Sequence, residues 1–268
     1  MSAAEAAPEA TEVPLHRLHW TRTPHGVEAG VSTRSGGVSG EPFASLNVSF
    51  TSGDRADRVV ENRRRIARSA GYAAESAVLP VLEHGTNTVV VEPRHAGLGA
   101  LAPAPPLRAD ALVTRYVGPA LLATSADCAP VFLADREGRA VGIAHAGWRG
   151  AADGIVRKAH RRLTGLLPED ACILAAIGPC IGPCCFEVGP EVAERFSAIP
   201  HAVQEVAGLR PHVDLFAALR AQLVEAGAEV SDSRPPCTCC QSDRFFSHRA
   251  MGRQVTGRML GFIFRRER

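Results

Sequence analysis

The sequence predicts a layered α/β domain built around a mixed β-sheet. Its 268 residues, 46% of them hydrophobic, are enough to bury a substantial core. Short apolar runs of strand length outnumber helical segments. Strands and helices also do not follow the regular alternation of a parallel sheet. Residues 14–268 contain no clear linker, and we expect a single domain there, preceded by a disordered tail over residues 1–13.

The first elements expected are a strand over Val27–Ser32, which alternates weakly, and a helix over 55–69. Asp54 is a suitable N-cap for this helix, and Gly71 is a suitable stop. Short apolar runs then predict seven buried strands, at 78–82, 88–91, 111–114, 121–123, 131–134, 140–144 and 172–177. Helices fit best at 151–163, 191–196 and 213–226.

Composition excludes several classes of function. The 30 basic and 28 acidic residues nearly balance, so we expect no nucleic-acid partner. Lys158 is the only lysine and lies among arginines typical of a solvated helix face, which argues against Schiff-base and lysine-dependent P-loop chemistry. We see neither a secretory signal nor a run long enough to span a membrane, and expect a cytoplasmic protein with no membrane contact. Its eight cysteines should then be mostly reduced.

Three short segments have the composition of a functional site: residues 83–87, 125–130 and 145–150. Each places a polar or metal-capable side chain at the end of an apolar strand, namely His84, Cys128 and His145. If the strands at 131–134 and 140–144 form a hairpin with a two-residue loop, Cys128 lies directly opposite His145. Pro130 cannot donate to the ladder, which leaves the register open at this end.

Two imidazoles and one thiolate are the protein ligands of a catalytic zinc ion with an open fourth position. Without a metal, Cys128 and His145 form a nucleophile–base pair, and plain core packing is the third interpretation. Asp110 and Asp127 are the nearest carboxylates, suited to acid–base work or to orienting an imidazole. Arg149, in a glycine-flanked turn before a helix, is a candidate phosphate clamp.

A second group of cysteines comprises Cys180, Cys184, Cys185, Cys237, Cys239 and Cys240. In principle four of them could form a tetrathiolate zinc site. The spacing is not that of paired C-x2-C motifs, and we favour reduced structural cysteines.

Several ordered motifs between residues 25 and 264 resemble the YfiH family, also called the laccase-domain or polyphenol-oxidase-like family. They are TRSGGVS from Thr33, SLN from Ser45, HG from His84, ADAL from Ala109, ADCAP from Ala126, AHAGWRG from Ala144, IGPCIGPCCFEV from Ile177 and FFSHR from Phe245. His248 stands where tyrosine is common in the family.

The resemblance implies an αββα-like fold, similar to the catalytic domain of cytotoxic necrotizing factor toxins. It implies zinc bound by His84, Cys128 and His145, which are also catalytic residues together with Asp127. The resemblance also implies two reactions, phosphorolysis of adenosine, inosine or methylthioadenosine and deamination of adenosine. The implied binding partners are a purine nucleoside and phosphate. The candidates for binding phosphate or nucleoside are Asn47, Arg34, Arg63, Arg149 and Arg249.

Two alternatives stay open. One is a Cys–His amidase that edits a peptidoglycan precursor. The other is a copper phenol oxidase, which we favour less because none of the ten histidines lies in an H-x-H segment of the kind multicopper oxidases use, although such a site can bind Cu²⁺.

Overall fold

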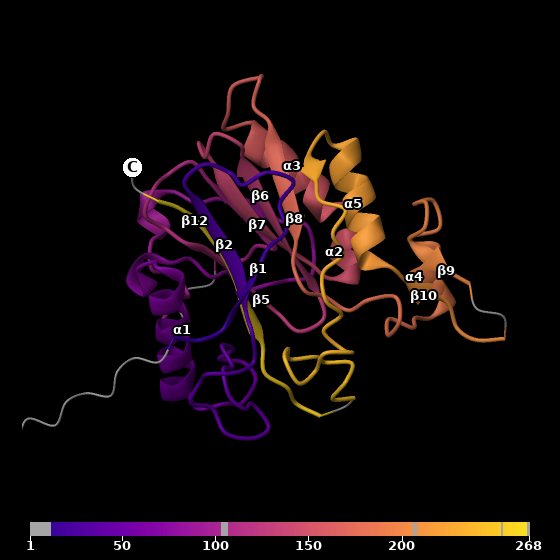
Figure 1. Cartoon of the computed structure of the whole chain (residues 1–268), viewed down its shortest axis with the longest axis horizontal. Coiled ribbons are helices and arrows are strands. Elements are labelled where there is room, and N and C mark those ends of the chain that lie inside the picture. Colours follow the sequence, from indigo (N-terminus) through magenta and orange to yellow (C-terminus); the bar gives the residue numbers. More distant parts are fainter. Residues whose placement is uncertain (1–11, 103–106, 206–207, 253, 267–268) are drawn as a thin grey trace, which may run out of the picture.

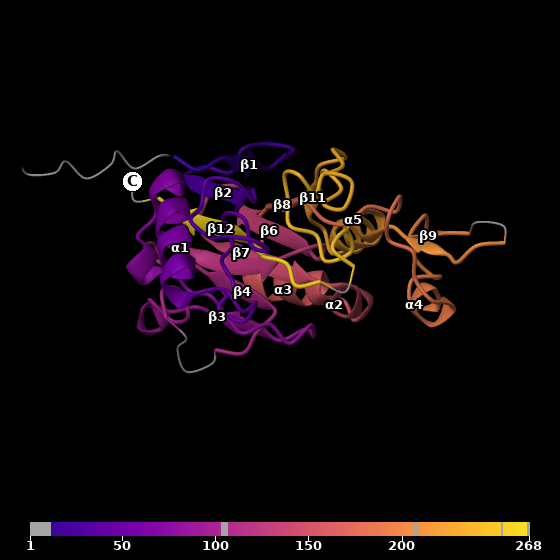
Figure 2. The ribbon, with the colours of Figure 1, turned by 90° about the horizontal axis from the view of Figure 1, so that it is seen from below.

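Two β-sheets pack face to face, and helices cover both outer faces, in a computed structural model that describes residues 12–102, 107–205, 208–252 and 254–266 (Figures 1 and 2). The predicted layered mixed α/β fold is thus confirmed. Residues 1–11 of the expected tail lie outside the described residues. Val13 is buried, and its amide donates to Ser69 Oγ at 2.9 Å.

The first sheet is antiparallel, with the order β1 (Leu15–Arg17), β2 (Val27–Ser32), β12 (Met259–Arg265) and β5 (Leu121–Ser125). β2 has the predicted bounds, whereas the sequence analysis assigned no element to β12.

Helix α1 (Ala56–Ala70) covers the outer face of this sheet, where Ile66 packs in a cluster with Leu260 and Phe262 of β12. It ends at Gly71, which adopts a left-handed φ of 83°. The N-cap prediction was wrong: Arg55 is the N-cap, without a side-chain bond. The Asp54 carboxylate instead accepts from the Ser39 hydroxyl at 2.6 Å and the Asn47 amide at 3.0 Å.

The second sheet is mixed: the two outer strand pairs are parallel and the inner ones antiparallel. Its order is β11 (Glu229–Val230), β8 (Ile173–Ile177), β6 (Ala129–Asp135), β7 (Val141–Ala146), β4 (Ala111–Thr114) and β3 (Thr88–Val90). Five of the seven predicted apolar strands lie here, and a sixth is β5. The run at 78–82 forms isolated bridges rather than a strand, since its chain contacts Gly99, Leu121 and Arg108 one residue at a time.

Apolar side chains fill the space between the sheets, with Phe132 and Ile143 of the second sheet packed against Met259 and Ile263 of β12. The far face of the second sheet is covered by α2 (Trp148–Ala152), α3 (Ile155–Thr164) and α5 (Leu215–Glu225). One helix was expected over 151–163. Two form, because Gly154 adopts a left-handed φ of 76° between α2 and α3.

The remaining short elements lie mostly outside the two sheets. They are η1 (Ala74–Ser76), η2 (Pro93–His95), α4 (Pro190–Glu194), β9 (Val203–Gln204) and β10 (His212–Val213), the last two forming a separate antiparallel pair. Among the described residues, no helix combines the length and the apolarity that crossing a bilayer requires.

Candidate metal and catalytic site

The β6–β7 hairpin brings the predicted cysteine and histidine together, but in a different register. Pro130 faces His145, so the ladder continues with Cys128 opposite Gly147, and the expected direct pairing of Cys128 with His145 was wrong. The loop has four residues rather than two, because the Asp135 amide donates to the Ala140 carbonyl at 3.0 Å. A shift of two residues leaves every side chain on its face, and Cys128 therefore still reaches His145 diagonally.

His84, Cys128 and His145 form one donor set. Their ligand atoms all lie within 4.8 Å of one another. The two imidazoles meet edge to face, with centroids 4.9 Å apart and an angle of 88° between the rings. Gly147 leaves the space that they need: a Cβ there would lie 3.1 Å from Cys128 Sγ and 3.3 Å from His84 Cδ2. Two nitrogens and one sulfur at this spacing can bind a transition-metal ion and leave a position open.

Asp110, just before β4, holds the loop that carries His84. Its buried carboxylate accepts the backbone N–H groups of Glu83 at 3.1 Å, His84 at 2.8 Å and Gly85 at 2.8 Å. These bonds support the left-handed conformation of His84, whose φ is 58°. Asp110 Oδ1 also lies 3.7 Å from His145 Nδ1, which is buried without a hydrogen-bond partner. One carboxylate thus positions both histidines, as expected of a group that orients metal ligands.

The charges of the site are strongly coupled. Burial opposes ionisation of Cys128, but the adjacent His145 and His84 outweigh it and lower the pKa of the thiol to about 6. Burial likewise opposes a charged His145, but the Cys128 thiolate and Asp110 raise its pKa to about 9. Burial raises the pKa of Asp110, yet His145 and the N–H groups of Gly85 and His84 bring it below its usual value. In the metal-free protein, the cysteine and histidine therefore form a thiolate–imidazolium pair at neutral pH.

Asp127 precedes Cys128 in a left-handed conformation with a φ of 89°. One carboxylate oxygen accepts from the Thr238 hydroxyl at 2.6 Å, and the other accepts from the Arg249 amide at 2.7 Å. Its backbone carbonyl accepts from the Ile181 amide at 2.9 Å. Asp127 therefore joins three segments beside the site, and its acid–base role stays a prediction.

The three ligands open into a cavity of about 790 Å³, large enough for a drug-sized ligand. Phe50, Trp148 and Phe186 supply aromatic surface, while Asp127 is the only carboxylate among the described residues that line the cavity. The described part of the cavity wall also contains four arginines, at positions 63, 149, 249 and 258. This excess of positive charge beside an apolar wall suits a ligand that is partly aromatic and partly anionic.

The predicted arginines differ in how tightly they are held. Arg63 is buried and donates to the carbonyls of Val48, Gly99 and Ala100; burial lowers its pKa to about 10, which leaves it charged at neutral pH. Arg249 is exposed and donates to two carbonyls of the neighbouring 185–187 loop.

Arg149 and Arg258 complete the set. The Arg149 guanidinium is exposed and stacks 4.6 Å from the Trp148 ring. Arg258 is half-buried, and sequence reasoning missed it. Arg258 directly precedes the apolar run 259–265, and recognising that run as a strand would have placed Arg258 at a strand end, where functional residues gather.

Two predicted binding residues do not line this cavity. Asn47 is fully buried: its amide donates to Ser52 Oγ and its carbonyl accepts the amide of Arg258 at 3.0 Å. Arg34 donates to the carbonyls of Ala44 and Ser242. Both residues brace loops, and their role in ligand binding stays a prediction.

Comparison with known proteins shows the family of this chain. Residues 28–266 match the family described as multi-copper polyphenol oxidoreductase laccase, so the chain belongs to that family. The chain is 39% identical over 254 residues to "Purine nucleoside phosphorylase YlmD" of Geobacillus stearothermophilus, covering 90% of this chain and 91% of the relative. A crystal structure of that YlmD aligns with a TM-score of 0.82 at 37% identity, over 92% of this chain and 96% of the other.

Two further relatives have informative names. "Purine nucleoside phosphorylase YfiH" of Escherichia coli is 36% identical, over 90% of this chain and 95% of its own length. "Adenosine deaminase RL5", from an unknown prokaryotic organism, is 33% identical, over 95% of this chain and 100% of its own length. These names support an enzyme and a small-molecule substrate, and the predicted YfiH-family membership is confirmed. The likeness to the toxin catalytic domain stays a prediction.

Proposed function

We propose that this chain is a zinc-dependent purine nucleoside phosphorylase that also deaminates adenosine. The observation that carries the proposal is the continuity of one cavity, which joins the His84–Cys128–His145 donor set to arginines and aromatic rings. Relatives named for both activities support it. Adenosine, inosine and methylthioadenosine are the proposed nucleosides.

The donor set suits zinc. Two imidazoles and one thiolate leave the divalent ion a net positive charge, and Asp110 holds one histidine by its backbone and faces the other. A zinc ion bound here would supply Lewis acidity, which polarises an oxygen atom of substrate or water.

The other cavity residues bind and orient the reactants. Arg149, Arg249 and Arg258 present positive charge where phosphate would enter, and buried Arg63 adds to the field. The rings of Trp148 and Phe186 offer a surface on which a purine can stack. Asp127 is proposed to exchange a proton with the reacting base. Its carboxylate is held by Thr238 and Arg249, so its position is set before substrate binds.

The test is incubation of the purified protein with each nucleoside, with and without phosphate. Phosphorolysis predicts free base and ribose 1-phosphate, or 5-methylthioribose 1-phosphate from methylthioadenosine, only when phosphate is present. Deamination predicts inosine from adenosine without phosphate. Cys128→Ser should abolish both. Cys172→Ser is the matched control, because Cys172 lies beside the opposite end of β6. Zinc-loaded protein that forms no product under either condition would refute the proposal.

A second candidate, a Cys–His amidase acting on a peptidoglycan precursor, is favoured by the lowered pKa of Cys128 beside His145. It predicts a metal-free enzyme whose activity survives chelators and is lost when a thiol reagent labels Cys128. Loss of amidase activity on chelation would exclude it. A copper phenol oxidase is not proposed: the metal-capable groups among the described residues contain two histidines in all.

A further inference from the structure

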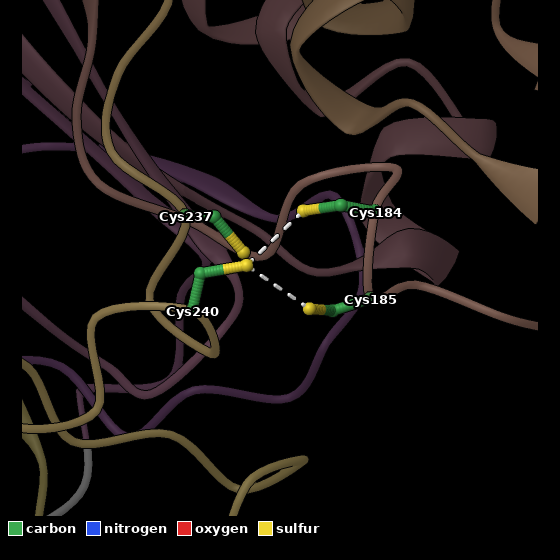
Figure 3. A group of neighbouring side chains, drawn as sticks. All are labelled: Cys184, Cys185, Cys237 and Cys240. Atoms are coloured by element: carbon green, nitrogen blue, oxygen red, sulfur yellow. Dashed lines mark hydrogen bonds between the residues drawn. The ribbon is translucent and has the colours of Figure 1, made fainter.

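Four cysteines outside the cavity gather into a compact cluster. Cys184 and Cys185 come from one loop, Cys237 and Cys240 from another, and their side chains point toward one another (Figure 3). The four sulfur atoms all lie within 4.8 Å of one another. Cys240 Sγ lies 3.4 Å from the sulfurs of both Cys184 and Cys185.

These distances suit a tetrahedral metal site. Zinc–sulfur bonds of about 2.3 Å in a tetrahedron place sulfur atoms about 3.8 Å apart, within the spread of the cluster. A disulfide requires sulfurs about 2.05 Å apart, and all eight cysteines are free thiols. Four sulfur ligands without nitrogen or oxygen favour zinc or iron among the common metals.

The backbone holds the two loops together around the cluster. Residues 180 and 237 form a parallel bridge, and the Thr238 amide donates to the Cys180 carbonyl at 3.0 Å. The Gly182 amide donates to Cys237 Sγ at 3.2 Å, a contact that stabilises a thiolate. Because these backbone bonds hold both loops in place, they lower the ordering cost of binding an ion.

The fold also selects four cysteines from six. Cys180 is only 3% exposed and packs in the main core, and Cys239 packs against the same core. Neither belongs to the cluster. Within the C-x-C-C segment, the two ligating positions are therefore Cys237 and Cys240, which have the C-x2-C spacing of many zinc sites.

The cluster adjoins one wall of the cavity. The Arg249 guanidinium donates to the Cys185 carbonyl at 2.6 Å, and the Thr238 hydroxyl donates to Asp127. Phe186 and Arg249 both line the cavity. An ion in the cluster would join the two loops that carry these residues.

We propose that Cys184, Cys185, Cys237 and Cys240 bind a second, structural zinc ion, which fastens loops 182–187 and 237–249 into one wall of the cavity. Binding releases the protons of the four thiols and forms four zinc–sulfur bonds.

Metal content is the first test. Protein purified without chelators should contain two zinc ions per chain, and Cys128→Ser one. The double variant Cys184→Ser/Cys240→Ser, which takes one ligand from each loop, should also contain one. The matched control Cys239→Ser changes a neighbouring cysteine outside the cluster and should retain two. Equal zinc in the control and the double variant, or iron in place of zinc, would overturn the proposal.

A spectroscopic test does not depend on how the double variant folds. Cys128→Ser protein, stripped of metal and reloaded with Co²⁺ alone, should show the intense visible absorption of tetrahedral tetrathiolate cobalt. Wild-type protein treated in the same way should show this absorption together with the bands of cobalt at the His84–Cys128–His145 site. The assignment fails if the Cys128→Ser spectrum shows only weak, octahedral-type bands. These readouts require no enzymatic activity, so they stand or fall separately from the proposed function.

Discussion

The carboxylate of Asp110 offers the sharpest test of how the site is assembled. It accepts three backbone N–H groups from the loop that carries His84 and lies 3.7 Å from His145 Nδ1. Asp110→Asn keeps the size of the side chain but removes the charge. If the remaining amide oxygen accepts the N–H groups of Glu83 and His84, the new NH2 group faces the N–H group of Gly85. Two hydrogen-bond donors then oppose each other.

The magnitude follows from these contacts. Loss of one hydrogen bond to a charged, buried acceptor costs roughly 1.5–3 kcal/mol of folding stability. Removing the carboxylate beside a ligating imidazole weakens metal binding by about 10–100-fold, which equals roughly 1.4–2.8 kcal/mol. We therefore expect Asp110→Asn to lose both stability and zinc affinity.

The assay is competition for zinc against a chromogenic chelator, with thermal unfolding of the metal-free protein measured in parallel. The Cys184→Ser/Cys240→Ser background removes the second site from the zinc count. Glu83→Gln is the control, since it also removes one carboxylate charge, from the loop that Asp110 holds, where the exposed Glu83 pairs with Arg108. Equal zinc affinity in Asp110→Asn and Glu83→Gln would refute the argument that Asp110 orients the ligands.

Three further predictions test other parts of the site. A Cβ at Gly150 would lie 2.7 Å from the Gly85 carbonyl oxygen, so Gly150→Ala should displace the loop that carries His84. Turnover should fall at least tenfold, since a 1 Å misplacement costs about 10²-fold in rate. A variant with wild-type turnover would contradict this prediction. In metal-free protein, alkylation of Cys128, followed by peptide mass spectrometry, should rise with pH around a midpoint near 6, because the thiolate forms above its lowered pKa. His145→Ala removes the cation and should move that midpoint upward; an unchanged midpoint would show that His145 does not set it. Arg258→Gln should raise the KM for phosphate by about tenfold, the weight of one charged hydrogen bond, and change the KM for adenosine less; equal effects on both would refute a phosphate role.

The layers and most strands could be predicted because each rests on a local pattern of apolar residues. Both errors in bounds that matter for the site come from glycines in left-handed conformations. Gly138 lies in the four-residue β6–β7 loop, and Gly154 separates α2 from α3. Sequence shows that a glycine permits such a turn, but only the surrounding packing decides whether the chain uses it.

The donor set could be predicted because His84, Cys128 and His145 each end an apolar run beside small or acidic residues. The cavity could not, since its wall comes from segments far apart in the chain. Arg258 and Asn47 are both polar residues in loops, yet Arg258 lines the cavity, whereas the side-chain oxygen of buried Asn47 accepts the backbone N–H of Arg258. Likewise, the C-x-C-C spacing does not reveal which cysteine turns toward the core.

Strand β12 lies between β2 and β5, with Gly261 paired to Val31 on one side and to Ala123 on the other. During synthesis on the ribosome, β2 and β5 emerge long before this central partner, and each exposes an unpaired edge while it waits. Arg249 and Arg258 also reach the cavity late, on the segment that leads into β12. The complete first sheet therefore cannot form until β12 is available, and until then β2 and β5 keep open edges of the kind that favours aggregation.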